Sequence, residues 1–354
     1  MLIKAAIAVA VLLIAAAVCW KVLSDRATQA VFTPIDYYAQ DLDTYEFPSD
    51  TADSLKSKGN AAIGNNDRSQ GISLYVYAIR NELLSGENDP AIANLDYAIT
   101  LTNGMDNGDK ERLLVLLSRM FRSVRSELQR HHSYATLAAI LKRTLTFKKS
   151  ISEKPDYQTM FFLTALPQII LDQSTTEKDD QVKKDLQAEA IAFATDEISA
   201  ARSLYQADSL RRQQCIWQAT HVIAAAGDPQ RAHMVLEQEK KDVEAKAGPQ
   251  ALQLVPLIAR MALIEERVVN DKSAIYKQAD NLEKIARQQN PLFLKDSALI
   301  CEAAWDLSAC SNQTTEDGRA SEAVSRARDH LNILAGQQGA MASTIASYSG
   351  LHLN

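Results

Sequence analysis

Glycine and proline are scarce in this chain of 354 residues, with only 12 and 9 occurrences. Sandwiches, barrels and propellers of β-strands need turn residues roughly every ten positions, so this scarcity argues against all three. Alanine, the strongest helix former, is abundant, with 52 occurrences. Apolar residues make up 46% of the chain, which excludes wholesale disorder and allows a sizeable core. The composition therefore predicts a mostly helical protein.

Cysteine and net charge are also low. Four cysteines are too few for a disulfide scaffold, especially because Cys19 falls within an apolar N-terminal run. We expect the other three, Cys215, Cys301 and Cys310, to be small core residues. The formal net charge of −6 is mild for this length and argues against a protein that coats nucleic acid.

Sequence motifs for catalysis and cofactor binding are missing. The chain has no GxGxxG, P-loop or GxSxG pattern, so neither a nucleotide site nor an activated serine is predicted. No two of its six histidines are four residues apart, the spacing that puts two metal ligands on one helix face. The sequence thus predicts no enzyme activity, catalytic residue, cofactor, metal ion or small-molecule substrate. An all-α enzyme without a recognisable motif, or an accessory subunit of a membrane enzyme complex, is the alternative.

An uncharged apolar run extends from Ala5 to Trp20, between Lys4 and Lys21. Such a run rises about 24 Å as a helix, so the flanking lysines must snorkel for it to cross a hydrocarbon core of about 30 Å. We expect residues 1–24 to form a single transmembrane signal anchor. A cleaved signal peptide and a lipid-modified Cys19 are the alternatives.

Charges beside this run favour one orientation weakly. The amino terminus and Lys4 carry two positive charges, whereas residues 21–26 carry a net charge of +1. Under the positive-inside rule, this difference predicts a cytoplasmic N-terminus and an exported, periplasmic body.

Residues 25–52 are predicted to be an acidic linker, followed by a helical domain over residues 53–335 and a C-terminal tail over residues 336–354. Residues 25–53 hold seven acidic side chains against one arginine. They also hold five aromatic residues: Phe32, Tyr37, Tyr38, Tyr45 and Phe47. Because such rings are normally buried, we expect the linker to lie on the domain or on a partner.

Helical periodicity recurs along the predicted domain. On a helical wheel of residues 110–130, the apolar side chains fall within about 120° and the arginines lie opposite. The apolar positions are Leu113, Leu114, Leu117, Met120, Phe121, Val124 and Leu128. Similar stripes occur around residues 216–226, 252–269, 275–287 and 299–309. Turn signals separate the helices at Asn103, Gly227, Gly248 and Asn290.

Several segments resemble tetratricopeptide repeats, in which about 34 residues form a helical hairpin. The best match runs from Ala52 to about Ser85 and carries the small, turn and aromatic positions Leu55, Gly59, Asn66, Asp67, Gly71, Tyr75 and Ala78. Partial matches follow at Ala91, Leu95 and Ala98, at Ala232 and Leu236, and at Ala279 and Ala286. The resemblance implies hairpins stacked as a right-handed solenoid that binds peptides or partner subunits. Residues 131–210 lack the signature, so an irregular helical domain is the alternative.

A basic stripe is the one candidate binding feature. Residues 110–149 hold ten basic and two acidic side chains, a net charge of +8, so the rest of the chain carries −14. On the wheel, one face gathers Arg112, Arg119, Arg122 and Arg130. Such a stripe can recruit an acidic protein, anionic lipid or nucleic acid. Alternatively, it is solvated or balanced by the linker or by residues 177–185.

From these observations we expect a membrane-anchored, all-α scaffold or adaptor. We expect it to bind partner proteins that are acidic where they contact the basic stripe. We also expect its N-terminal helix to insert into the membrane.

Overall fold

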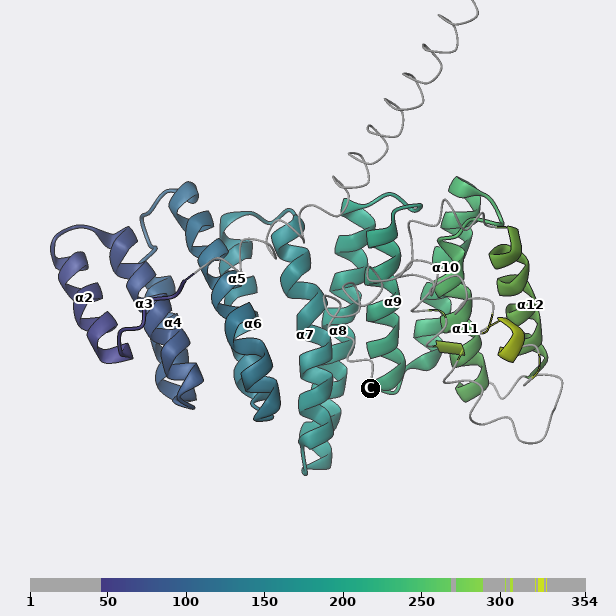
Figure 1. The fold of residues 1–354 in the computed structure, drawn as a ribbon, viewed down its shortest axis with the longest axis horizontal. Helices are drawn as coiled ribbons and strands as arrows, with labels where there is room; N and C mark the ends of the chain where they lie inside the picture. Colours follow the sequence, from purple (N-terminus) through teal and green to yellow (C-terminus); the bar gives the residue numbers. More distant parts are fainter. Residues whose placement is uncertain are drawn as a thin grey trace, which may run out of the picture.

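The structure, a computed structural model, describes residues 46–268 and 272–288, together with a few positions between 303 and 329. These residues form helices and connecting turns without a β-strand, which confirms the predicted all-α class. The helices are α2 (Ala52–Gly64), α3 (Arg68–Leu84), α4 (Asn88–Thr100), α5 (Asn107–Arg130), α6 (Tyr134–Ile151), α7 (Tyr157–Thr176), α8 (Asp180–Leu204), α9 (Leu210–Ala225), α10 (Pro229–Ala247), α11 (Leu254–Val268) and α12 (Lys272–Gln288). They follow one another along the long axis of the molecule (Figure 1).

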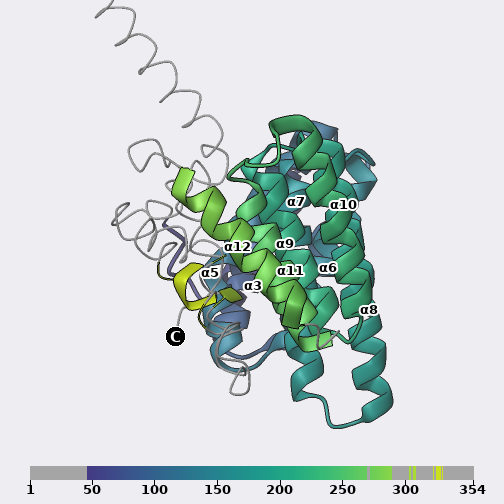
Figure 2. The same ribbon diagram turned by 90° about the vertical axis from the view of Figure 1, so that its right-hand side faces the viewer.

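The helices pack in two layers. Apart from α4 and α5, helices that follow one another along the chain pack against each other; further contacts join α3 to α5, α7 to α9, and α9 to α11. In the second layer, α4 contacts α6. Seen from its end, the row has α6, α8 and α10 on one side and α3 and α5 on the other (Figure 2). We call α3, α5, α7, α9 and α11 the odd layer, and α4, α6, α8 and α10 the even layer.

The first hairpin, α2–α3, lies where the sequence predicts it and depends on two glycines. A Cβ on Gly71 would lie 2.5 Å from Cγ1 of Ile63, and a Cβ on Gly59 would lie 3.1 Å from the ring of Tyr75. The two helices therefore approach closely only because these positions lack side chains. Asn66 takes a left-handed φ of 63° in the turn between them.

Helix α5 is the amphipathic helix predicted over residues 110–130. Its predicted apolar face is buried at every position: Leu113, Leu114, Leu117, Met120, Phe121, Val124 and Leu128. The Asp106 carboxylate caps the helix by accepting a hydrogen bond from the backbone N–H of Asp109, at 2.9 Å. This helix therefore joins the core through one stripe and leaves its arginines on the other side.

Several of the predicted turns, apolar stripes and core cysteines fall on residues that the structure describes. Gly227 and Gly248 follow α9 and α10 with positive φ values of 104° and 92°, which glycine adopts without steric cost. Helices α9, α11 and α12 coincide with three of the predicted stripes, and Cys215 is buried as expected. Asn290, Cys301, Cys310 and residues 336–354 lie outside the described residues.

The predicted anchor, residues 1–24, and most of the predicted linker also lie outside the described residues. Within the part of the chain that the structure describes, no helix is both long enough and apolar enough to cross a bilayer.

Candidate interaction surface

Among the described residues, four arginines stack on aromatic rings along the odd layer. The pairs, with distances from the guanidinium carbon to the ring centroid, are Arg80–Phe47 at 4.4 Å, Arg122–Phe161 at 4.5 Å, Arg211–Tyr157 at 5.9 Å and Arg260–Trp217 at 4.1 Å. We call these eight residues the arginine–aromatic row. Stacks of this kind are worth about 0.5–1 kcal/mol when exposed and about 2 kcal/mol when desolvated.

The row connects successive helices of the odd layer. Its last three pairs bridge α5 to α7, α7 to α9, and α9 to α11. The step from α3 to α5 is made by Arg80, whose Nε donates a hydrogen bond to Oγ of Ser123 at 3.1 Å. The arginines of the row thus join successive helices of the odd layer.

At the N-terminal end of the row, the chain itself lies on α3 as a non-helical segment, residues 46–51. Phe47 stacks on Arg80 and makes an edge contact with Tyr77 at 6.0 Å between ring centroids. Nδ2 of Asn81 donates to the backbone carbonyl of Asp50 at 2.8 Å. Helix α3 thus holds this non-helical segment through one aromatic side chain and one backbone carbonyl.

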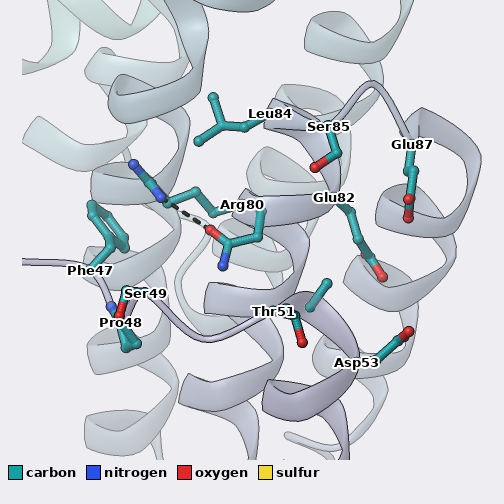
Figure 3. A pocket seen from close by; sticks show the side chains of 12 residues that line it. Phe47, Pro48, Ser49, Thr51, Asp53, Arg80, Glu82, Leu84, Ser85 and Glu87 are labelled. Atoms are coloured by element: carbon teal, nitrogen blue, oxygen red, sulfur yellow. Dashed lines mark hydrogen bonds between the residues drawn. The ribbon is translucent and has the colours of Figure 1, made fainter.

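A pocket of about 650 Å³ opens beside this segment. Figure 3 shows Arg80 and Phe47 at one side of it, with Glu82, Glu87 and Asp53 at the other. Glu82 is fully buried; its carboxylate accepts hydrogen bonds from Nζ of Lys56 at 3.0 Å and from Nδ2 of Asn94. The hydrogen bonds that Lys56 makes with Asp53 and Glu82 raise the pKa of this lysine. Two acidic side chains at the pocket, Asp53 and Glu82, are therefore already paired with Lys56.

At the C-terminal end of the row, a carboxylate from a later part of the chain joins the last stack. Oδ2 of Asp306 accepts a hydrogen bond from Nε1 of Trp217 at 2.8 Å and lies 3.1 Å from Nε of Arg260. Nη1 of Arg260 also lies 2.9 Å from Nδ1 of His221. Trp217, Arg260 and Asp306 are almost completely buried. The Asp306 carboxylate is therefore shielded from solvent and paired with the Arg260 guanidinium.

Exposure varies in the middle of the row, where Arg211 is buried. Tyr157 is 53% exposed, and Arg122 and Phe161 are half-buried. Nearby on α7, burial raises the pKa of Asp172, opposed by a hydrogen bond from Gln168 and by the charge of Arg125. The centre of the odd layer therefore exposes the Tyr157 ring, while its charged groups are partly or fully buried.

The four arginines of the predicted basic stripe do not converge on one point. Arg112 pairs with Asp109 at 3.1 Å, and Arg130 pairs with Glu127 at 2.6 Å, each within α5 itself. Arg122 stacks on Phe161, and Arg119 is half-buried one turn earlier. Arg112 and Arg130 thus pair within α5. Arg122 belongs to the arginine–aromatic row, and Arg119 lies one turn from it on the same helix. Partner binding by the four arginines stays a prediction.

Sequence reasoning missed a buried ionic cluster between α9 and α10. Glu239, with no exposed surface, accepts two hydrogen bonds from Arg212 at 2.6 and 3.0 Å and one from Gln213 at 3.0 Å. Arg212 also pairs with Asp242 at 2.7 Å. These residues are 26 to 30 positions apart, so no local pattern could bring them together. Because every charge in the cluster has a partner, we assign it to packing of the fold.

Among the described residues, no three histidine, cysteine, aspartate or glutamate side chains are placed to hold a metal ion. Comparison of the whole sequence with family models and with curated proteins gives no significant match.

Proposed function

We propose that this chain is a membrane-anchored scaffold or adaptor that binds a partner protein along the odd layer. The observation that carries the proposal is the segment of residues 46–51, held on α3 by Phe47 stacking and by the Asn81 hydrogen bond. A surface that binds one non-helical segment through an aromatic ring and a backbone carbonyl has the chemistry to bind another.

The repeat type forms part of the proposal. The close α2–α3 approach at Gly59 and Gly71, together with the two-layer row (Figure 1), supports a right-handed, tetratricopeptide-like solenoid. In such an array, each hairpin packs mainly on its neighbours and leaves a long surface for binding.

Membrane attachment is proposed through residues 1–24, with the helical body exported to the periplasm. The support comes from the apolar run between Lys4 and Lys21. The full chain should stay with membranes through high-salt and carbonate washes and keep its terminus at Met1. A mature terminus at Val18 or Val31 would show a cleaved signal peptide instead.

The binding proposal is tested by co-purification of the full chain from detergent-solubilised membranes. We expect a stoichiometric protein partner, and we expect its recovery to drop sharply when Arg119, Arg122 and Arg130 are changed to glutamate. A matched variant reverses Lys184, Lys241 and Lys246, which are exposed on the even layer, and should retain the partner. A chain that purifies alone, or a partner lost equally from both variants, would contradict the proposal.

The same variants separate external binding from internal pairing. Reversal of exposed Arg130 should change the melting temperature little, because an exposed charge is typically worth well under about 1 kcal/mol, whereas half-buried Arg119 and Arg122, the latter stacked on Phe161, should add a small loss of stability. A variant that binds normally but melts several degrees lower would show that the arginines are paired within the chain.

A further inference from the structure

The described chain begins with a segment that crosses the first hairpin. Near the end of this segment, the Asp50 carboxylate pairs with Nζ of Lys58 on α2 at 2.5 Å. Near its start, Phe47 stacks on Arg80 of α3, and Arg80 in turn donates a hydrogen bond to Ser123 of α5. Followed backward from Asp50 to Phe47, the chain thus runs from α2 across α3 to the side of α3 that contacts α5 (Figure 1). The chain before Phe47 is therefore directed at α5.

The face of α5 on that side carries two arginines. Arg119 and Arg122 are half-buried, and the exposed Ser126 follows them. Spacings of three and four residues place all three side chains on one face of the helix. Taking a guanidinium group partly out of water is costly unless an anion accompanies it. This face of α5 therefore favours an acidic neighbour.

Residues 32–45, which precede the described segment, have a composition that matches this face. They hold three acidic and four aromatic side chains and no lysine or arginine: Asp36, Asp41 and Asp43, with Phe32, Tyr37, Tyr38 and Tyr45. Packed helices lie about 8–10 Å apart, and an extended chain covers that distance in about three residues. Counted back from Phe47, Asp43 and Tyr45 are therefore within reach of α5.

We propose that residues 32–45 dock on Arg119 and Arg122 of the same chain, continuing the path of Phe47 across α3, and compete there with the partner protein. The docking stands on the contacts and charges above, whereas the competition rests on the proposed scaffold function. The aspartates supply anions to the two guanidinium groups, and the aromatic rings repeat the chemistry of Phe47 on Arg80. A partner that binds the same arginines must displace the chain's own segment.

Photo-cross-linking of the full chain in detergent tests the docking. Benzoylphenylalanine replaces Ser126, which follows Arg122 on the same face of α5, or, as a control, Met234, which is 65% exposed on α10 of the even layer. We expect position 126 to give an adduct within one chain, mapped by mass spectrometry to residues 32–45, and position 234 to give none. No adduct with residues 32–45 from position 126, the same adduct from both positions, or an adduct formed only between two chains would overturn the docking.

Variants of residues 32–45 test which groups hold them. Changing the three aspartates to asparagine should lower the yield of the intrachain adduct severalfold, and raising the salt concentration should act in the same direction, because exposed charge pairs are screened. Changing Thr33, Gln40 and Thr44 to alanine is the matched control and should leave the yield unchanged. An equal yield from the aspartate variant and the unchanged chain would overturn the proposal.

The competition has a readout of its own. The three-aspartate variant should raise the recovery of the co-purified partner, because the arginines become more available to it. Unchanged or lower recovery would overturn the competition, while the intrachain adduct alone decides the docking. If no partner is recovered from either chain, the scaffold function is wrong, and the adduct still tests the docking.

Discussion

The Arg260 guanidinium lies 4.1 Å from the centroid of the Trp217 ring, and both side chains are almost completely buried. A buried cation needs a compensating charge, and Asp306 supplies it from a part of the chain 46 residues beyond Arg260. The pair therefore ties a C-terminal residue to the odd layer at α9 and α11.

Asp306→Ala should lower the free energy of unfolding by about 3 kcal/mol or more, because it leaves Arg260 buried without its carboxylate. Urea denaturation followed by circular dichroism measures the change. Asp280→Ala, at an exposed position on α12, is the control and should change stability by less than about 0.5 kcal/mol. Equal effects of the two substitutions would show that Asp306 does not balance Arg260.

Two glycine substitutions in the first hairpin should have opposite effects. Gly71→Ala should destabilise the protein by about 1–3 kcal/mol, since the new Cβ would lie 2.5 Å from Ile63 Cγ1. Gly64→Ala meets no atom within 4 Å and should stabilise α2 by about 0.5–1 kcal/mol through helix propensity. Thermal melting of both variants checks the prediction, and stabilisation by Gly71→Ala would refute the close approach of α2 and α3.

Glu197 should make stability depend on pH. Its side chain is almost completely buried, and burial raises the pKa of this carboxyl well above its ordinary value. The unfolded chain releases this proton near pH 4.3, so stability is lost as pH rises from there toward the raised pKa of the folded state. Glu197→Gln should therefore stabilise the protein at pH 7.5 and change little at pH 4. A stability gain that is the same at both pH values would contradict this assignment.

Local sequence patterns predicted the parts of the fold that neighbouring residues determine. The α2–α3 hairpin and the apolar stripe of α5 follow from spacings within one or two helices, and both lie where expected. The arginine–aromatic row could not be predicted, because the ring and the cation of each pair come from different parts of the chain. A wheel of α5 alone places Arg122 toward solvent, whereas α7 lies beside it and brings the Phe161 ring under its guanidinium.

The most direct test of the scaffold account is site-specific photo-cross-linking in the cells that produce the protein. Benzoylphenylalanine replaces Tyr157, exposed on α7, or Met234, which is 65% exposed on α10. We predict that position 157 yields an adduct with a partner protein, identified by mass spectrometry, and that position 234 yields none. No adduct from position 157, or the same adduct from both positions, would contradict binding along the odd layer.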